Sequence, residues 1–269
     1  MIKFSIVTPS YNQGKYIRQT IESVLSQKGN FEIEYFVMDG GSTDDTVKII
    51  KKYESIIKKN EINKLNKKIT FFWQSKKDKG QSDAINQGLK KATGDILAYI
   101  NSDDTYTDGA FQKVVNGFKK DSKKKWLTGY CNIINQDNKP IRNVIARYKN
   151  FWLRRYSYKN LLILNPISQP ATFWKKEILR KYGLFDKKLD YTMDYEYWLR
   201  IGADNNPVTI TSPLANFRIH GQSKGETAFR KQFNQDYAVC CQYCKSKILR
   251  LAHSVHNGLI KTAYKLIKS

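Results

Sequence analysis

The sequence lacks a long hydrophobic segment, since no apolar run approaches the ~18 residues that a membrane-spanning helix needs. It also lacks the opening of a signal peptide, because a strand pattern begins within the first residues. We therefore expect the chain to stay in the cytoplasm.

Cysteine and histidine are scarce, with 4 Cys and 3 His in 269 residues. In a cytoplasmic chain the cysteines are expected to be free thiols rather than disulfides. They are Cys131, Cys240, Cys241 and Cys244. The last three fall on one expected helix with no clear fourth ligand nearby, so a structural zinc site is not favoured. His253 and His256 are expected at the surface.

Acidic residues are about half as frequent as basic ones: 24 Asp and Glu against 47 Lys and Arg give a formal net charge of +23. Such a charge favours anionic partners, namely nucleotides, anionic lipid surfaces or nucleic acid. The lysines are spread through a chain also rich in Asn and Ile, as an AT-rich genome would produce, so charge alone does not choose a partner. The 17 Tyr, 13 Phe and 5 Trp exclude global disorder.

The stretch from Gly94 to Tyr106 is central to the predicted fold and site. Its apolar run, Ile96 to Ile100, predicts a short buried strand that ends by placing Asp103 and Asp104 in a polar loop. Adjacent carboxylates repel each other unless a cation or a donor-rich ligand lies between them. Hard divalent cations are the natural candidates. A plain turn is the alternative, because Asp, Asn and Ser are common in loops.

Three further strands precede this one and alternate with helices. They are expected at Phe4–Thr8, Ile33–Met38 and Ile69–Trp73. The order strand–helix–strand, repeated, predicts an α/β fold with a doubly wound, mostly parallel sheet. Ser42 and Asp45 resemble a capping box before the second helix. Residues 60–68 form a Lys- and Asn-rich surface insertion.

Polar residues follow each of the four strands. The clusters are Thr8–Tyr11, Asp39, Lys76–Asp83 and Asn101–Asp104. Because the carboxyl ends of parallel strands share one edge of a sheet, we expect all four clusters to meet there. This convergence favours a ligand site over a plain turn.

The second half of the chain loses the clean alternation. We expect helices at 109–120, 158–164 and 189–201, a hairpin at 126–145 that turns at 136–138, a strand or helix start at 171–174, strands within 207–219, and helix from about residue 225 to the end.

Six motifs in combination resemble family 2 glycosyltransferases of the GT-A fold, especially bacterial enzymes of O-antigen and surface polysaccharide synthesis. The motifs are Val7-Thr8-Pro9-Ser10-Tyr11-Asn12, Asp39-Gly40-Gly41-Ser42-Thr43-Asp44, Gly80-Gln81-Ser82-Asp83-Ala84-Ile85-Asn86, Asn101-Ser102-Asp103-Asp104, Met193-Asp194-Tyr195-Glu196-Tyr197-Trp198-Leu199-Arg200, and His220. The resemblance implies a GT-A domain at 1–223, with a nucleotide-sugar-binding half (1–106), a mixed acceptor-binding half (107–223) and a helical tail (224–269).

The resemblance also implies an activity: inverting transfer of a hexosyl or N-acetylhexosaminyl group from a nucleotide-sugar donor, with UDP expected, to a hydroxyl of a glycan or lipid-linked glycan. Manganese or magnesium is the implied cofactor. Transfer to a polyprenyl phosphate is an alternative within the family. A processive synthase is not expected, because the chain lacks both membrane spans and a Gln-x-x-Arg-Trp motif. A basic nucleic-acid-binding protein is the alternative from another class, but no nucleic-acid module is recognisable and we expect no such partner.

Site residues carry over by motif. The implied nucleotide-sugar-binding residues are Thr8, Pro9, Tyr11, Asp39, Gln81, Asp83, Asn101, Ser102 and Asp103. The implied metal ligands are Asp103, Asp104 and His220. Asp194 matches the catalytic base. Contacts to the acceptor or the donor sugar are expected from Gln169, Glu196 and Trp198.

Elementary chemistry agrees with these roles. One buried carboxylate, Asp39, can accept the single acidic N–H of a uracil-type base, and Tyr11 offers a flat face for stacking. A carboxylate base on the far side of the sugar, here Asp194, removes the proton of the attacking hydroxyl. Glu196 lies two positions later on an expected helix, so the two carboxylates diverge by roughly half a turn and only one can face the acceptor.

Two departures from the family pattern concern the site. Asn101 stands where many relatives have Asp, which reduces the metal motif to Asp103 and Asp104, and Met193 stands where many have Glu. Simpler roles also remain open: a helix N-terminal charge for Asp194, a hydrogen-bonded loop histidine for His220, and a strand-end cap for Asp39.

The C-terminal tail has an amphipathic pattern. Its apolar positions are Ile248, Leu251, Ala252, Val255, Leu259, Ala263 and Leu266, and its basic positions are Lys247, Arg250, Lys261, Lys265 and Lys268. Such a helix can lie on an anionic membrane, which predicts a peripheral location on the inner face of the cytoplasmic membrane. The alternative is that the apolar stripe packs against the catalytic domain.

Overall fold

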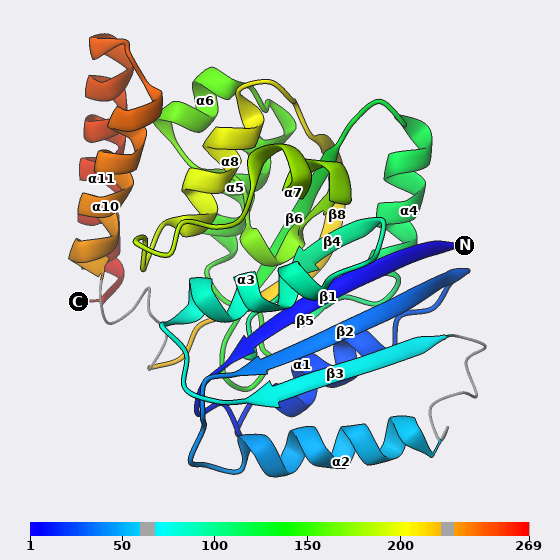
Figure 1. Cartoon of the computed structure of the whole chain (residues 1–269). Coiled ribbons are helices and arrows are strands. Elements are labelled where there is room, and N and C mark those ends of the chain that lie inside the picture. Colours follow the sequence, from blue (N-terminus) through cyan, green and yellow to red (C-terminus); the bar gives the residue numbers. More distant parts are fainter. Residues whose placement is uncertain (60–67, 222–228, 269) are drawn as a thin grey trace.

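The computed structural model describes residues 1–59, 68–221 and 229–268 (Figure 1). Most of the expected insertion at 60–68, together with Gln222 and Ser223 after the late histidine, lies outside these residues. Within them the chain forms a single eight-stranded sheet with the order β3-β2-β1-β4-β7-β6-β8-β5.

The first half of the chain forms the parallel part of the sheet. Strand β1 pairs in parallel with both β2 and β4, and β2 pairs in parallel with β3. The strands are β1 (Ile2–Ser10), β2 (Phe31–Asp39), β3 (Ile69–Ser75) and β4 (Ile96–Tyr99). The predicted doubly wound sheet is confirmed, and its strand order reverses between β1 and β4, where such sheets bind ligands.

The second half forms the mixed part. Strand β7 runs antiparallel to β4 and β6, β8 runs parallel to β6, and β5 runs antiparallel to β8. The strands are β5 (Thr105–Tyr106), β6 (Trp126–Ile134), β7 (Thr172–Lys175) and β8 (Val208–Arg218).

The hairpin expected at 126–145 is only partly correct. After the turn, the return arm makes one antiparallel bridge, between Ile134 and Pro140, and helix α5 (Asn143–Arg154) follows. The physical reason lies in the sheet, because β7 and β8 already occupy both edges of β6 and leave no edge for a returning strand.

Helices cover both faces of the sheet (Figure 1). One face carries α1 (Ile17–Leu25), α2 (Thr46–Lys58) and α4 (Ala110–Lys120). The other carries α3 (Gln81–Lys91), α6 (Tyr158–Ile163), α7 (Lys176–Tyr182) and α8 (Met193–Gly202).

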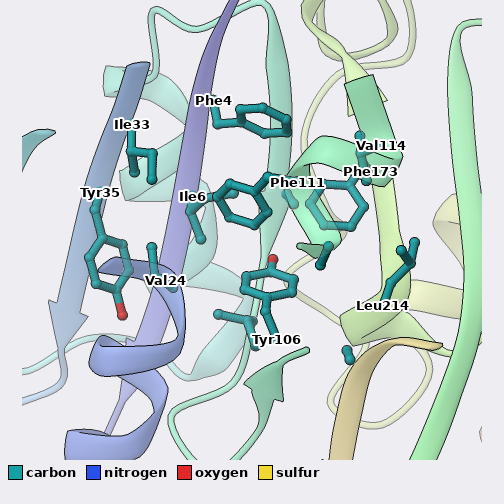
Figure 2. Packing of buried hydrophobic residues seen from close by; sticks show 14 of the residues in the cluster. Phe4, Ile6, Val24, Ile33, Tyr35, Tyr106, Phe111, Val114, Phe173 and Leu214 are labelled. Carbon is teal, nitrogen blue, oxygen red and sulfur yellow. The ribbon is translucent and has the colours of Figure 1, made fainter. Parts of the chain in front are cut away.

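Successive side chains of β1 alternate between the two cores, as the pleat requires. Phe4 and Ile6 join the core beneath α1 and α4, whereas Val7 faces α3. Figure 2 shows the first core, where the rings of Phe4 and Phe111 stack with centroids 4.6 Å apart. On the other face, a Cβ at Gly88 would lie 2.6 Å from Val7 Cγ1, so glycine lets α3 approach β1 closely.

The C-terminal helices α10 (Phe229–Tyr243) and α11 (Lys247–Lys268) stand together at one side of the molecule (Figure 1). The expectation that His253 is a surface residue is wrong, because it is buried between these helices and α6. Its Nδ1 lies 2.9 Å from the carbonyl oxygen of Leu162, and its Nε2 lies 2.9 Å from Asp236 Oδ2. Burial lowers the pKa of His253, but Asp236 and Cys240 together raise it to about 10.

His256 is not a fully exposed surface residue either. It is half-buried, and its Nε2 lies 2.9 Å from the hydroxyl of Tyr148 on α5. The four cysteines are free thiols, as predicted.

Candidate active site

The predicted convergence of polar clusters at the carboxyl edge is confirmed. Ser10 at the end of β1 is in register with Asp39 at the end of β2. Ser75 at the end of β3 donates a hydrogen bond from its hydroxyl to Asp39 Oδ2 over 2.6 Å. Gln81 at the start of α3 donates to Asn101 Oδ1, also over 2.6 Å. The polar residues of the four strand ends therefore lie along one edge of the sheet.

Asp39 is buried and organises the turn that follows β2. Its Oδ2 accepts the backbone N–H groups of Gly41 and Ser42 over 3.0 and 2.9 Å, and its Oδ1 accepts the Ser42 hydroxyl over 2.5 Å. With Ser75 this makes four donors, three of them on Oδ2, so Oδ1 keeps capacity for one more. The predicted capping box is wrong, because Ser42 bonds to Asp39, and α2 begins after Asp45 without a side-chain cap.

The residues after β1 provide the mouth of the site. Tyr11 is 61% exposed, so its ring is accessible for stacking. Thr8 is buried and its hydroxyl lies 3.0 Å from that of Tyr35 in the core, so this side chain points away from the mouth. Pro9 is buried, and the hydroxyl of buried Ser10 has no hydrogen-bond partner among the described residues.

Asp83 lies at the rim. It accepts from the Lys187 ammonium and the Lys79 backbone N–H, each over 3.3 Å. Burial raises the pKa of Asp83, but the hydrogen bonds from Lys79, Lys187 and Gln87, with the charge of Lys187, together lower it below its ordinary value. Asp78, which sequence reasoning did not single out, lies against the Gly40 turn, and burial raises its pKa.

The two adjacent carboxylates of the central loop face different surroundings. Asp104 is 0% exposed: its Oδ1 accepts the backbone N–H of Arg218 over 2.8 Å, and its Oδ2 accepts the Asn101 amide over 3.3 Å. Burial and the charge of Asp103 raise the pKa of Asp104 well above its ordinary value. Asn101 thus supplies a donor that a carboxylate could not. Ser102, which lies between Asn101 and Asp103 in the sequence, is also buried.

Asp103 instead keeps a side chain that is 20% exposed, and its Oδ2 lies 3.0 Å from His220 Nε2. The His220 ring packs against Tyr16 with centroids 4.6 Å apart. A carboxylate and an imidazole are suitable ligands for a divalent cation. No group of three His, Cys, Asp or Glu side chains meets in the described part of the chain, so a cation bound here would take its remaining ligands from outside the protein. The residues present fit a cation of this kind.

Arg218 is a buried site residue that sequence reasoning missed. Its Nε donates to the carbonyl oxygen of Asp103 over 2.7 Å, and its Nη2 donates to Gln19 Oε1 over 2.7 Å. Its guanidinium also lies 5.2 Å from the Tyr16 ring centroid. The Arg218 guanidinium therefore holds the Asp103 loop through its backbone carbonyl and leaves the Asp103 carboxylate to His220. The available signal was an arginine two positions before His220 in a strand without other charges.

Asp194 occupies the first turn of α8, where the helix dipole favours a negative charge. Burial raises its pKa, and the nearby Lys149 ammonium opposes that shift. The charges of Asp194 and Asp104 both contribute to the raised pKa of Tyr99, the last residue of β4, after the larger effect of burial. The Ser82 hydroxyl in the first turn of α3 lies 2.6 Å from Met193 Sδ, which places the start of α8, and Asp194 with it, beside the start of α3.

Gln169 lies beside the same strand end. Its Nε2 donates to the Tyr99 carbonyl oxygen over 2.7 Å, and its Oε1 is buried with no partner among the described residues. The backbone therefore holds one end of the amide, and the other end is a buried acceptor that lacks a donor.

Two residues expected to contact a sugar are placed elsewhere. Glu196 points from the other side of α8 and pairs with Arg200, with contacts of 2.7 and 3.0 Å, and with the hydroxyl of Tyr243 on α10. Trp198 lies one turn beyond Asp194, inside the core, stacked on Trp126 with centroids 5.7 Å apart. The helix period explains both placements, because it turns position 196 to α10 and carries position 198 away from the helix start.

Replacing Glu196 by glutamine should lower the free energy of unfolding by about 2 kcal/mol and leave transfer nearly unchanged, because Arg200 loses its ionised partner. Thermal denaturation and transfer rate measure the two effects. Glu177→Gln is the matched control, since its pair with Lys125 is exposed and contributes little. Loss of transfer at an unchanged melting temperature would place Glu196 in the site after all.

Residues 5–183 match the protein family described as Glycosyl transferase family 2. This chain therefore belongs to glycosyltransferase family 2. It is 29% identical over 221 residues to an uncharacterized glycosyltransferase of Mycobacterium tuberculosis (strain CDC 1551 / Oshkosh), covering 81% of this chain and 75% of the relative. It is 28% identical over 233 residues to one of Rickettsia typhi (strain ATCC VR-144 / Wilmington), covering 84% and 67%.

Solved structures share the fold. S. aureus TarS 1–349 in complex with UDP-GlcNAc has a TM-score of 0.62 at 17% identity, covering 93% of this chain and 69% of that one. The mannosyltransferase PcManGT from Pyrobaculum calidifontis, in complex with GDP-Man and Mn2+, also has a TM-score of 0.62, at 18% identity and 93% and 68% coverage. In another TarS structure this chain spans 41% of the longer chain. The predicted GT-A fold is confirmed.

Proposed function

We propose that this glycosyltransferase moves a sugar from a UDP-sugar, with inversion and with the help of Mn²⁺ or Mg²⁺, to a hydroxyl of a lipid-linked glycan during synthesis of a surface polysaccharide such as O-antigen. The observation that carries the proposal is the pairing of Asp103 with His220, 3.0 Å apart, at the edge where Gln169 and Asp194 also lie. The similar structures that hold UDP-GlcNAc, or GDP-Man with Mn²⁺, support a nucleotide-sugar donor.

The diphosphate end of the donor is assigned to Asp103 and His220. A divalent cation held there would neutralise the negative charge that grows on the leaving diphosphate. Arg218 keeps Asp103 in place through the loop carbonyl, and Asp104 is assigned to positioning because its carboxylate is turned into the protein.

The base end of the donor is assigned to the mouth beside β1 and β2. Tyr11 supplies an exposed ring for stacking, and Asp39 supplies the remaining acceptor capacity of Oδ1 for a uracil N–H. The partnerless hydroxyl of Ser10, in register with Asp39, is a further polar group at this end.

Transfer itself requires a base on the far side of the sugar. Asp194 is assigned this role, because burial raises its pKa toward the range in which a carboxylate accepts a proton effectively. Its carboxylate takes the proton of the acceptor hydroxyl as that oxygen attacks the anomeric carbon and the bond to the diphosphate breaks.

Screening UDP-, GDP- and dTDP-sugars for metal-dependent hydrolysis and transfer tests this function. We expect turnover with a UDP-sugar, stimulated by Mn²⁺ or Mg²⁺ and lost on chelation. No turnover with any donor, together with salt-sensitive DNA binding in a gel shift, would favour the nucleic-acid alternative.

Replacing Gln169 by alanine should lower kcat/KM for the acceptor about tenfold, the effect of losing one buried hydrogen bond, without weakening UDP binding. Acceptor kinetics and UDP calorimetry measure the two quantities, and the melting temperature monitors the loss of the bond to Tyr99. Equal losses in acceptor kinetics and UDP affinity would assign Gln169 to the nucleotide end.

A further inference from the structure

The apolar stripe of α11 faces solvent within this chain. Ile248, Leu251, Val255 and Leu259, spaced so that they share one side of the helix, are 56–79% exposed. The helix is docked by its other side, through His253 and Asn257. This stripe therefore does not pack against the catalytic domain, contrary to the alternative considered from the sequence. The side chain of Leu266 lies outside the described residues.

A second exposed apolar stripe lies beside it on α5. Val144, Tyr148 and Phe151 share one side of that helix and are 78%, 37% and 48% exposed. The Tyr148 hydroxyl lies 2.9 Å from His256 Nε2, and the two rings are stacked with centroids 6.1 Å apart. This contact between Tyr148 and His256 links the two helices that carry the stripes. The joined surface, called the α5–α11 face, consists of Val144, Tyr148, Phe151, Ile248, Leu251, Val255 and Leu259.

The segments that form this face contain no acidic residue. None lies between Asp137 and Glu177, and none follows Asp236. Exposed basic side chains flank the apolar ones, namely Arg147, Arg154 and Lys247. The guanidinium of Arg155 also lies 3.9 Å from the ring centroid of Phe151. The face is thus apolar, and the charged residues of the two helices that carry it are all basic.

We propose that the α5–α11 face binds the surface of an anionic bilayer, with both helices lying in the headgroup region. Apolar side chains on one side of a helix with basic residues around them are the pattern of such helices. Aromatic residues, here Tyr148, Phe151 and the neighbouring Trp152, suit the membrane–water interface. No helix in the described residues is long and apolar enough to cross a membrane.

A second copy of the chain is a poorer occupant. A two-fold symmetric pair would bring the same face of each chain together and place two basic rims opposite each other. Like charges placed opposite each other across an interface are costly. An anionic lipid surface instead complements both parts of the face.

The position of the face also relates to the active site, a point that rests on the proposed function. Lys149 follows Tyr148 on α5, donates to the carbonyl oxygen of Ile167 over 3.1 Å and is near enough to Asp194 to affect its pKa. Helix α5 thus carries part of the α5–α11 face and also a lysine close to the proposed base, so membrane binding there would bring lipid-carried acceptors toward Asp194.

Co-sedimentation of the full chain with vesicles tests the proposal. The vesicles contain phosphatidylcholine alone or a mixture with phosphatidylglycerol, at low and at high salt. We expect binding to the mixed vesicles that weakens at high salt, as screening requires, and little binding to the neutral ones. Absence of binding to the mixed vesicles would overturn the proposal.

Matched substitutions locate the binding surface. Phe151→Ser should weaken vesicle binding about tenfold, whereas Phe72→Ser should not, because Phe72 is 45% exposed but lies on the distant edge strand β3. Arg147→Gln should weaken binding about fivefold, the loss expected for one charge near an anionic surface, and Lys119→Gln on α4 should not. Equal losses in the test and control variants would overturn the assignment to this face.

Two further readouts complete the test. Transfer to a soluble acceptor should be unchanged in Phe151→Ser and Arg147→Gln, so a failure of vesicle binding is distinct from a failure of the proposed function. Analytical ultracentrifugation should show a monomer for the wild type. A dimer that Phe151→Ser dissociates would replace the membrane by a second copy and overturn the proposal.

Discussion

Replacing Asp194 by asparagine should lower the rate of sugar transfer about 10²–10⁴-fold, the usual contribution of a general base. The amide is nearly isosteric with the carboxylate but cannot accept the proton of the acceptor hydroxyl. Affinity for the donor should hardly change, because the loss concerns the transition state and not ground-state binding. Single-turnover transfer and calorimetry with UDP measure the two quantities separately.

The pH profile gives an independent check on Asp194. The base acts when it is deprotonated, so transfer falls as the pH drops through its pKa. Because burial raises that pKa above the ordinary 3.8, the acid limb of kcat/KM should lie at a higher pH than for an exposed aspartate. This limb should disappear in Asp194→Asn. If Asp194→Asn is active and Glu196→Gln is inactive at an unchanged melting temperature, the base has been assigned to the wrong carboxylate.

Replacing Asp103 by asparagine should abolish metal-stimulated transfer and weaken UDP binding much more than uridine binding. Asp103 is the partly exposed carboxylate beside His220, so its loss removes a charged ligand at the diphosphate end and leaves the base pocket intact. Calorimetry with UDP and with uridine, with and without Mn²⁺, separates the two ends. Equal losses for both ligands would contradict the assignment.

Asp104→Asn is the matched control for that experiment. Asp104 was expected to be a metal ligand, but in the structure its oxygens accept from the Arg218 backbone and the Asn101 amide and its side chain is buried. The variant should therefore lower the melting temperature. It should leave the Mn²⁺ dependence of UDP binding largely in place. If Asp104→Asn removes the Mn²⁺ dependence and Asp103→Asn keeps it, the two roles are reversed.

The amino-acid sequence by itself predicted the parallel half of the fold. Alternating apolar runs and helical spacing are local patterns, and the right-handed crossover rule converts them into a sheet whose polar strand ends share an edge. The motifs around Asp39, Gln81 and Asp103 could therefore be placed together without a structure. The same patterns were weaker after Tyr106, where antiparallel pairing depends on which strand edges are already occupied.

The sequence also identified Gln169, but not which end of its amide is free. That depends on the carbonyl oxygen of Tyr99, a residue 70 positions away that accepts from Nε2 and leaves Oε1 unpaired. Contacts over such separations have no signature in local spacing.

Tertiary structure alone decided which of two adjacent carboxylates faces the site. The backbone N–H of Arg218, which lies 114 residues from Asp104, binds that side chain inside the protein and leaves Asp103 beside His220. Tertiary structure likewise buried His253 against Asp236 and placed Tyr148 of α5 against His256 of α11. The sequence determined the chemistry available and the elements that carry it, since both depend on neighbouring residues; the structure decided which groups are buried, because burial depends on residues that only the folded chain brings together.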